Sequence, residues 1–142
     1  MENKVILLVE DNPDDVRLTQ RALKDNHISN ELVIVSDGAA ALEYLLRASA
    51  EPDGILPAVT LLDLNLPKIN GLELLQRVRS NPKLKRLPVV ILTSSKEEID
   101  LVRSYDLGAN SYIQKPVEFD EFNTAVRQLG LYWLLLNEPP PR

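Results

Sequence analysis

Five short apolar runs recur along the chain at fairly even spacing, and they restrict its possible folds more than any other feature. They are Val5–Val9, Leu32–Val35, Val59–Leu62, Val89–Leu92 and Ser111–Ile113. The first four consist mostly of Val, Ile and Leu without polar alternation, which is typical of strands covered on both faces of a parallel sheet. The fifth run is weaker and is consistent with an edge strand.

A helical pattern follows the first run. Asn12-Pro13 is a helix start signal, because asparagine caps unpaired amide groups and proline is tolerated at the first helical position. Val16, Thr19 and Leu23 then fall on one face. This spacing predicts an amphipathic helix that packs against the sheet.

Similar patterns follow the other four runs. The expected helices cover about residues 38–46, 71–80, 96–107 and 118–129, with a loop over residues 47–57. Their expected inward-facing residues are Leu42, Leu45, Leu46, Leu72, Leu75, Val78, Ile99, Val102, Phe119, Phe122, Val126 and Leu129. Strands that alternate with helices predict an α/β fold, a doubly wound (βα)5 parallel sheet with right-handed crossovers.

Length and composition narrow the class of protein. The 142 residues fit one domain, and the absence of cysteine excludes disulfides and thiolate sites, as suits a cytoplasmic protein. The formal net charge of -5 argues against a broad electrostatic grip on nucleic acid. The apolar runs, including residues 131–136, are too short to span a bilayer. We therefore expect neither nucleic acid nor membrane as a partner.

Polar residues follow four of the five strands. Glu10 and Asp11 follow the first, Asp63 the third, Thr93 the fourth and Lys115 the fifth, whereas the second contributes no ionic residue directly. In an open α/β sheet the carboxyl ends of the strands meet at a crevice, so these groups should converge there.

This set of groups suits phosphoryl transfer. Clustered carboxylates repel one another, and a hard cation such as Mg²⁺, which prefers oxygen ligands, relieves the repulsion. An aspartate can act as a nucleophile toward phosphorus, while a lysine and a hydroxyl can stabilise the charge on the phosphoryl oxygens.

Together, Glu10-Asp11, Asp63, Thr93 and Lys115-Pro116 resemble the response-regulator receiver family across residues 4–129. The segment 62–67, followed by Asn70-Gly71, resembles the family's phosphoacceptor loop. The resemblance implies a flavodoxin-like fold with strand order 2-1-3-4-5. It also implies a receiver domain over residues 1–130.

The resemblance implies roles for the acidic residues. Asp63 would be the phosphoacceptor and, with Asp11, a direct Mg²⁺ ligand. Glu10 would bind Mg²⁺ through water, and Asn65 through its backbone carbonyl. Glu10 stands where aspartate is more usual in the family, a variant that leaves the metal site plausible.

Other roles fall on later residues. Lys115 would pair with the phosphoryl oxygens, and Thr93 would hydrogen-bond one of them in the active state. Tyr112 would be the switching aromatic, and the alternative is an ordinary edge-strand residue. The Lys115–Pro116 bond would be cis. His27 lies in a polar stretch after the first helix and is expected on the surface.

The resemblance predicts a phosphorylation switch that catalyses only its own phosphoryl uptake and dephosphorylation, with a sensor histidine kinase as partner. One alternative is an aspartyl-phosphate hydrolase of the haloacid dehalogenase type. That family requires a second aspartate at the position where this chain has Asn65. Another is a scaffold that is not phosphorylated.

The C-terminal residues exceed what a minimal receiver needs. Residues 131–142 are expected to extend the fifth helix into a proline-rich tail that resembles those of receivers serving phytochromes. The apolar segment, with Tyr132 and Trp133, predicts a homodimer through the face of helix four, strand five and helix five, which includes Phe122. The alternative is that the tail packs on its own domain.

Overall fold

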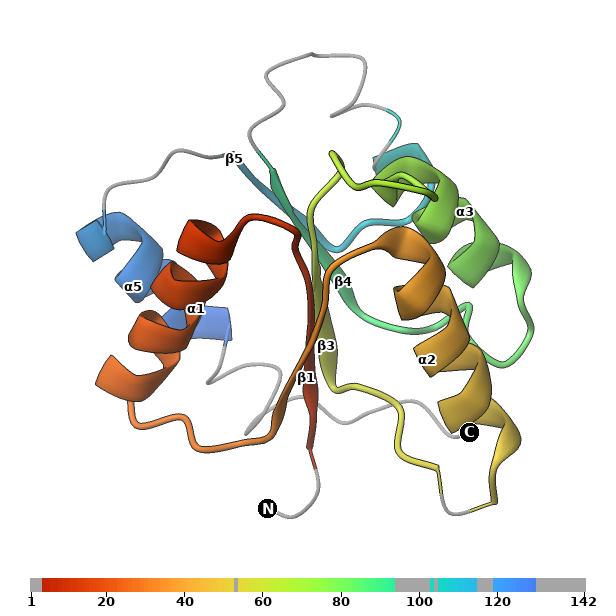
Figure 1. Cartoon of the computed structure of the whole chain (residues 1–142), viewed down its shortest axis with the longest axis horizontal. Coiled ribbons are helices and arrows are strands. Elements are labelled where there is room, and N and C mark those ends of the chain that lie inside the picture. Colours follow the sequence, from red (N-terminus) through yellow and green to blue (C-terminus); the bar gives the residue numbers. More distant parts are fainter. Residues whose placement is uncertain (1–3, 53, 94–102, 104, 115–118, 130–142) are drawn as a thin grey trace.

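The computed structural model describes residues 4–52, 54–93, 103, 105–114 and 119–129. These form a parallel sheet with helices on both faces (Figure 1), and the strand order is β2-β1-β3-β4-β5. The strands are β1 (Ile6–Val9), β2 (Leu32–Val35), β3 (Val59–Leu62), β4 (Val89–Thr93) and β5 (Ser111–Gln114). The helices are α1 (Pro13–Asp25), α2 (Gly38–Ala50), α3 (Gly71–Ser80) and α5 (Phe119–Leu129).

The apolar runs become strands because most of them are enclosed by helices. All residues of β1 and β3 are buried. In β2, however, Ile34 is 39% exposed. The expectation that this run is covered on both faces is therefore wrong, because β2 lies at an edge of the sheet.

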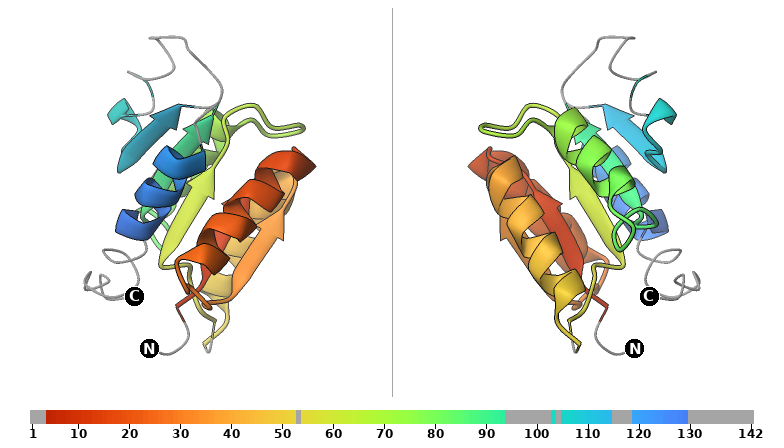
Figure 2. Two further views of the ribbon diagram at one scale, coloured as in Figure 1. Left: turned by 90° about the vertical axis from the view of Figure 1, so that its left-hand side faces the viewer. Right: turned by 90° about the vertical axis from the view of Figure 1, so that its right-hand side faces the viewer.

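Two hydrophobic cores lie on opposite sides of the sheet. Helices α1 and α5 cover one face, and α2 and α3 cover the other (Figure 2). Alternate residues of β1 and β4 serve the two cores. Leu7 and Leu62 belong to the core that includes α2 and α3, whereas Leu8 and Leu61 belong to the core that includes α1. The non-alternating apolar runs follow from this two-sided burial.

The start of α1 confirms its sequence signal. The Asn12 side chain accepts a hydrogen bond from the amide of Asp14 at 2.9 Å, and Pro13 opens the helix. Thr19 and Leu23 are buried as expected, and Val16 is partly buried against the same core.

The second helix differs from its prediction. It continues to Ala50, so residues 47–50 are helical and do not belong to the expected loop. Leu45 is fully buried, but Leu46 is 41% exposed and does not face inward. Helical spacing placed Leu46 at the margin of the apolar stripe, and only the packing decided that it lies outside the core.

Arg79 at the end of α3 fixes the turn that precedes β5. Its guanidinium donates to the backbone carbonyls of Leu87 at 2.7 Å and Gly108 at 2.6 Å. Gly108 has a φ of +89°, and a Cβ there would lie 2.7 Å from Arg79 Nε. Burial lowers the pKa of Arg79, yet a guanidinium stays charged in proteins.

Several expectations fall outside the described residues. These include Ile99, Val102 and the segment 131–142, and so most of the expected fourth helix and the whole C-terminal extension. Among the residues that are described, no helix is long and apolar enough to cross a membrane.

Candidate functional site

The acidic residues are positioned by the ends of two neighbouring strands. Strands β1 and β3 are parallel with Val9 opposite Leu62, so the residues after each strand come side by side. The Asp63 amide donates to the Val9 carbonyl at 3.1 Å, and the Glu10 amide donates to the Val35 carbonyl at 3.0 Å. Both acidic residues are therefore fixed by backbone hydrogen bonds to the adjacent strand.

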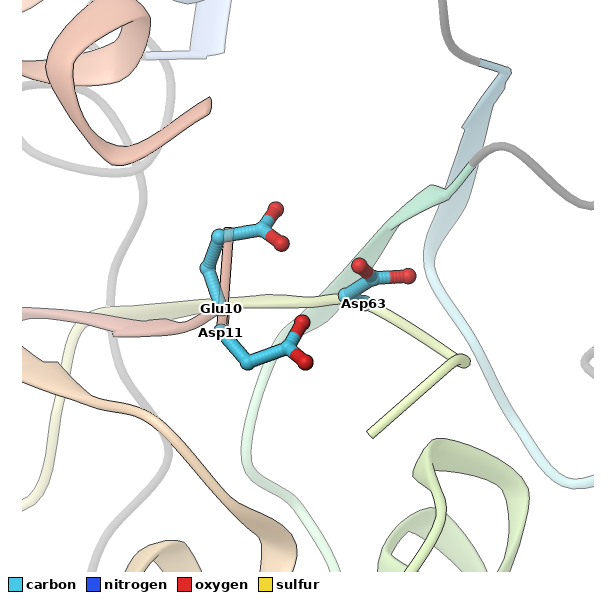
Figure 3. A group of neighbouring side chains, drawn as sticks. All are labelled: Glu10, Asp11 and Asp63. Carbon is cyan, nitrogen blue, oxygen red and sulfur yellow. The ribbon is translucent and has the colours of Figure 1, made fainter. Parts of the chain in front are cut away.

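The three carboxylates gather in one place. Glu10, Asp11 and Asp63 each offer a carboxylate oxygen, and these oxygens lie within 4.8 Å of one another. Figure 3 shows the side chains projecting from the ends of β1 and β3 into the same space. Glu10 and Asp63 are buried, at 2% and 6% exposed, whereas Asp11 is exposed. The cluster thus consists of two buried carboxylates and one that is open to solvent.

Two backbone amides orient the buried carboxylates. The Asn12 amide donates to Glu10 Oε2 at 3.3 Å. The Asn65 amide donates to Asp63 Oδ1 at 3.1 Å, and Asn65 itself is exposed. Both bonds hold a carboxylate by the amide of a residue two positions later in the chain.

The donor set suits a hard divalent cation. Two unit negative charges 4.8 Å apart repel by about 1 kcal/mol in water, and by about 3.5 kcal/mol at an effective dielectric constant of 20. A cation among the carboxylates turns this repulsion into attraction. All three ligands are oxygens, which favours Mg²⁺, Mn²⁺ or Ca²⁺ over metals that prefer nitrogen or sulfur. The residues present therefore fit a divalent cation.

The structure brings part of the expected site together. Glu10, Asp11 and Asp63 converge as predicted. Thr93 is the last residue of β4, next to β3, and Tyr112 lies in β5 opposite Ile91. The described residues do not include Lys115, Pro116, Tyr132 or Trp133. They also exclude the side chains of Thr93, Tyr112 and Phe122.

Two further polar residues, Asp14 and His27, lie on the surface, as the sequence predicts for His27. Asp14 is exposed in the first turn of α1 and pairs with Arg17, so it does not extend the acidic cluster. His27, the only histidine, is exposed.

The loop between β3 and α3 contains features that the sequence did not reveal. A Cβ at Gly71 would lie 2.5 Å from the Asp63 carbonyl oxygen, so only glycine fits there. Lys68 has a φ of +66° and pairs with Asp37, which lies two residues after β2. Strand β2 thus does contribute an ionic residue near this edge. The Asn70-Gly71 pair in the sequence indicated that the backbone at Gly71 comes close to another segment. No local sequence pattern identifies Asp37 as the partner of Lys68.

A doubly wound sheet with a carboxylate cluster at its switch point is typical of domains that transfer phosphoryl groups with the help of a divalent cation. The comparisons agree. The family of the response regulator receiver domain matches residues 6–127. Response regulator Rcp1 of Synechocystis sp. (strain ATCC 27184 / PCC 6803 / Kazusa) is 44% identical over 131 residues, which is 92% of this chain and 89% of Rcp1.

Solved structures show the same likeness. The phosphorylated cyanobacterial phytochrome response regulator RcpA has a TM-score of 0.85 and 41% identity, over 98% of this chain and 99% of that chain. The Mn²⁺-bound form of Rcp1 has a TM-score of 0.84 and 42% identity, over 97% and 99%. The bacteriophytochrome response regulator AtBRR has a TM-score of 0.75 and 52% identity, over 97% and 100%.

The chain therefore belongs to the response regulator receiver family, and it is close to the receivers of phytochrome systems. It is a signalling domain phosphorylated on an aspartate and not a conventional enzyme. The family assignment selects the receiver over the hydrolase alternative, and the complete acidic cluster argues against a receiver that serves only as a scaffold.

Proposed function

We propose that Asp63 is the aspartate that accepts the phosphoryl group from a sensor histidine kinase. The observation that carries this proposal is the cluster of Glu10, Asp11 and Asp63 within 4.8 Å at the carboxyl ends of β1 and β3. Asp63 is the member of the cluster that comes from the central strand β3, between β1 and β4. Asp63 therefore has the ends of two strands, β1 and β4, on either side of it.

The bound cation would be Mg²⁺. Asp11 and Asp63 would hold it directly, Glu10 through water, and Asn65 through its backbone carbonyl. When bound, Mg²⁺ supplies positive charge to the phosphoryl oxygens. The Mn²⁺-bound form of Rcp1 supports a divalent cation in a relative.

In the transfer step, a carboxylate oxygen of Asp63 forms a bond to phosphorus as the bond from phosphorus to a histidine nitrogen of the kinase breaks. The electron pair of the broken bond stays on that nitrogen. Lys115 would pair with the phosphoryl oxygens, and the Thr93 hydroxyl would donate to one of them. Such a step needs positioning and charge stabilisation more than covalent machinery.

The output would be a population shift between two states. As Thr93 approaches the phosphoryl group, Tyr112 would turn inward and alter the surface around β5. A cis Lys115–Pro116 bond would set the turn that places Lys115 at the site. Tyr112 supports this role by its position in β5 opposite Ile91 of β4, the strand that ends in Thr93.

The test of Asp63 is phosphorylation by acetyl phosphate with Mg²⁺, followed by intact mass spectrometry. We expect one phosphoryl group on the wild type and on Asp14→Asn, a matched control for an exposed carboxylate outside the cluster. Asp63→Asn should gain none, because an amide is not a nucleophile. Equal labelling of Asp63→Asn and the wild type would contradict the proposal.

For the partners, we propose a phytochrome-type histidine kinase and a homodimer. RcpA and AtBRR support the first by likeness. The dimer would use Phe122, Tyr132 and Trp133, with residues 131–142 extending helix α5 beyond a receiver domain of residues 1–130. A cytoplasmic location fits a chain without cysteine.

The dimer is tested by sedimentation of three proteins at the same concentration. We expect the full chain to be a dimer, a chain ending at Gly130 to be a monomer, and Trp133→Ala to dimerise more weakly. A full chain that stays monomeric with and without the phosphoryl mimic beryllofluoride would remove this proposal.

A further inference from the structure

Lys68 adopts a backbone conformation that lysine rarely takes. Its φ of +66° lies in the left-handed region, where an L-residue with a long side chain is strained and glycine is not. It lies in the loop between Asp63 and helix α3. Strained residues persist only where the surroundings hold them, so the contacts around Lys68 should explain its conformation.

The loop is held from outside by the turn between β2 and α2. Lys68 Nζ lies 3.7 Å from Asp37 Oδ2, and the Gly38 amide donates to the Pro67 carbonyl at 3.5 Å. A Cβ at Gly38 would lie only 1.9 Å from the Ile69 carbonyl oxygen. The two turns are therefore in direct backbone contact, with an ion pair beside the contact.

Asp37 is itself fixed in place. Its other carboxylate oxygen, Oδ1, accepts a hydrogen bond from the Ala40 amide at 2.7 Å, which caps helix α2. The Asp37 side chain is 18% exposed, whereas that of Lys68 is 69% exposed. Asp37 is thus the partner held in place, and the exposed side chain of Lys68 reaches to it.

The position of this contact relates it to the acidic cluster. Strand β1 lies between β2 and β3, so a bridge from the end of β2 to the loop after β3 passes the end of β1, where Glu10 and Asp11 lie. The same loop includes Asn65, whose amide donates to Asp63 Oδ1. At its far end, the Gly71 amide donates to the Leu64 carbonyl at 3.0 Å. Asp37 and Gly38 thus contact the middle of this loop, between its two hydrogen-bonded ends.

We propose that Lys68 is a positioning residue, and that its ion pair with Asp37 holds the loop of residues 64–70 in the shape that presents Asp63 and the Asn65 carbonyl to the cation. The part concerning the cation rests on the proposed function. The part concerning the loop does not, because the Lys68–Asp37 ion pair and the Gly38–Pro67 hydrogen bond involve none of the proposed cation ligands.

A simple charge effect predicts a different result from positioning. If Lys68 acted only through its charge, Lys68→Ala would raise Mg²⁺ affinity and Asp37→Asn would lower it. If the pair positions the loop, both variants lower the affinity, because each breaks the same contact. Asparagine caps helices as well as aspartate does, so Asp37→Asn should keep α2 intact.

The experiment measures Mg²⁺ affinity by calorimetry at 150 mM salt, where screening weakens charge effects. We expect Lys68→Ala and Asp37→Asn each to weaken binding about twofold to fivefold, the range of an exposed ion pair, and the double variant to be no weaker than either. Lys68→Arg should retain the wild-type affinity. Arg47→Ala removes a cation as exposed as Lys68, which pairs with Glu43 on α2, and should change nothing.

A second measurement uses the protein without a cation. Hydrogen exchange, followed by mass spectrometry of peptic peptides, should be faster in residues 36–40 and 64–71 of Lys68→Ala than of the wild type. Lys68→Gly relieves the strained φ, so its urea unfolding midpoint should match or exceed that of the wild type while its Mg²⁺ affinity falls. If Lys68 contributed only to stability, the unfolding midpoint and the Mg²⁺ affinity would change in the same direction.

The outcomes separate the two claims. Opposite changes in Mg²⁺ affinity for Lys68→Ala and Asp37→Asn, or unchanged hydrogen exchange in both segments, would overturn the positioning role. Wild-type protein that fails to bind Mg²⁺ while Lys68→Ala still exchanges faster would instead overturn the proposed cation site and leave the loop assignment supported.

Discussion

Replacing Thr60 by valine should stabilise the protein. Thr60 lies in the middle of β3, three residues before Asp63, and is 2% exposed. Its Oγ1 is buried and has no hydrogen-bond partner among the described residues. An unsatisfied buried hydroxyl costs about 1–3 kcal/mol, and valine has nearly the same shape without the polar atom. Valine also favours strands.

The expected gain is about 1–2 kcal/mol in the free energy of unfolding. For a domain of this size, 1 kcal/mol corresponds to roughly 3 °C in Tm, so Thr60→Val should raise Tm by about 3–6 °C. The assay is urea unfolding followed by circular dichroism. EDTA should be present so that cation binding does not contribute to the measured stability.

Thr19 is the matched control. It is also buried, at 1% exposed, but its Oγ1 donates to the Asp15 carbonyl at 3.0 Å. Thr19→Val removes a formed hydrogen bond and should cost about 0.5–1.5 kcal/mol. The two substitutions are chemically the same and should have opposite signs. If Thr60→Val destabilised the protein as much as Thr19→Val, the reasoning would be refuted, since the Thr60 hydroxyl must then have a partner.

Three further predictions concern the site and its surroundings. Mg²⁺ at ten times its Kd should raise the free energy of unfolding of the wild type by about 1.4 kcal/mol, and urea titrations with Mg²⁺ and with EDTA should coincide for Asp63→Asn. Gly38→Ala should cost about 1–3 kcal/mol by chemical unfolding, because its Cβ would press on the Ile69 carbonyl 1.9 Å away; an unchanged midpoint would show that the two turns move apart easily. Arg79→Ala should cost about 2 kcal/mol, because the carbonyls of Leu87 and Gly108 lose their donor, and Arg79→Lys should recover only part of this loss in the same assay.

The extent of most elements could be predicted from local patterns. The bounds of β2 and β3 match the apolar runs, and α1 and α3 begin where Asn12-Pro13 and Asn70-Gly71 predicted. These features are local. A capping side chain binds the free amide groups of its own helix, and a buried strand must be apolar wherever it lies in the sheet. Leu46 shows the limit of periodicity, since it lies at a helical position that the core does not reach.

The chemistry of the site could also be predicted, but its geometry could not. The sequence supplied the acids at the ends of strands, and the strand order came from the family resemblance. Only the fold brought β1 beside β3, buried Glu10 and Asp63, and left Asp11 exposed. The burial of a side chain at a strand end depends on which helices pack over it. The residues next to it in the sequence do not determine which helices these are.

The sequence by itself thus determined the doubly wound class, the helix starts and the acidic residue set, because each depends on residues within a few positions of one another. The tertiary structure alone decided that Ile34 of β2 is exposed and that Lys68 meets Asp37. Lys68 and Asp37 lie on different loops, one after β3 and one after β2. They can meet because only one strand, β1, lies between β2 and β3 in the sheet. Such a contact follows from the sheet order, which is a property of the whole chain.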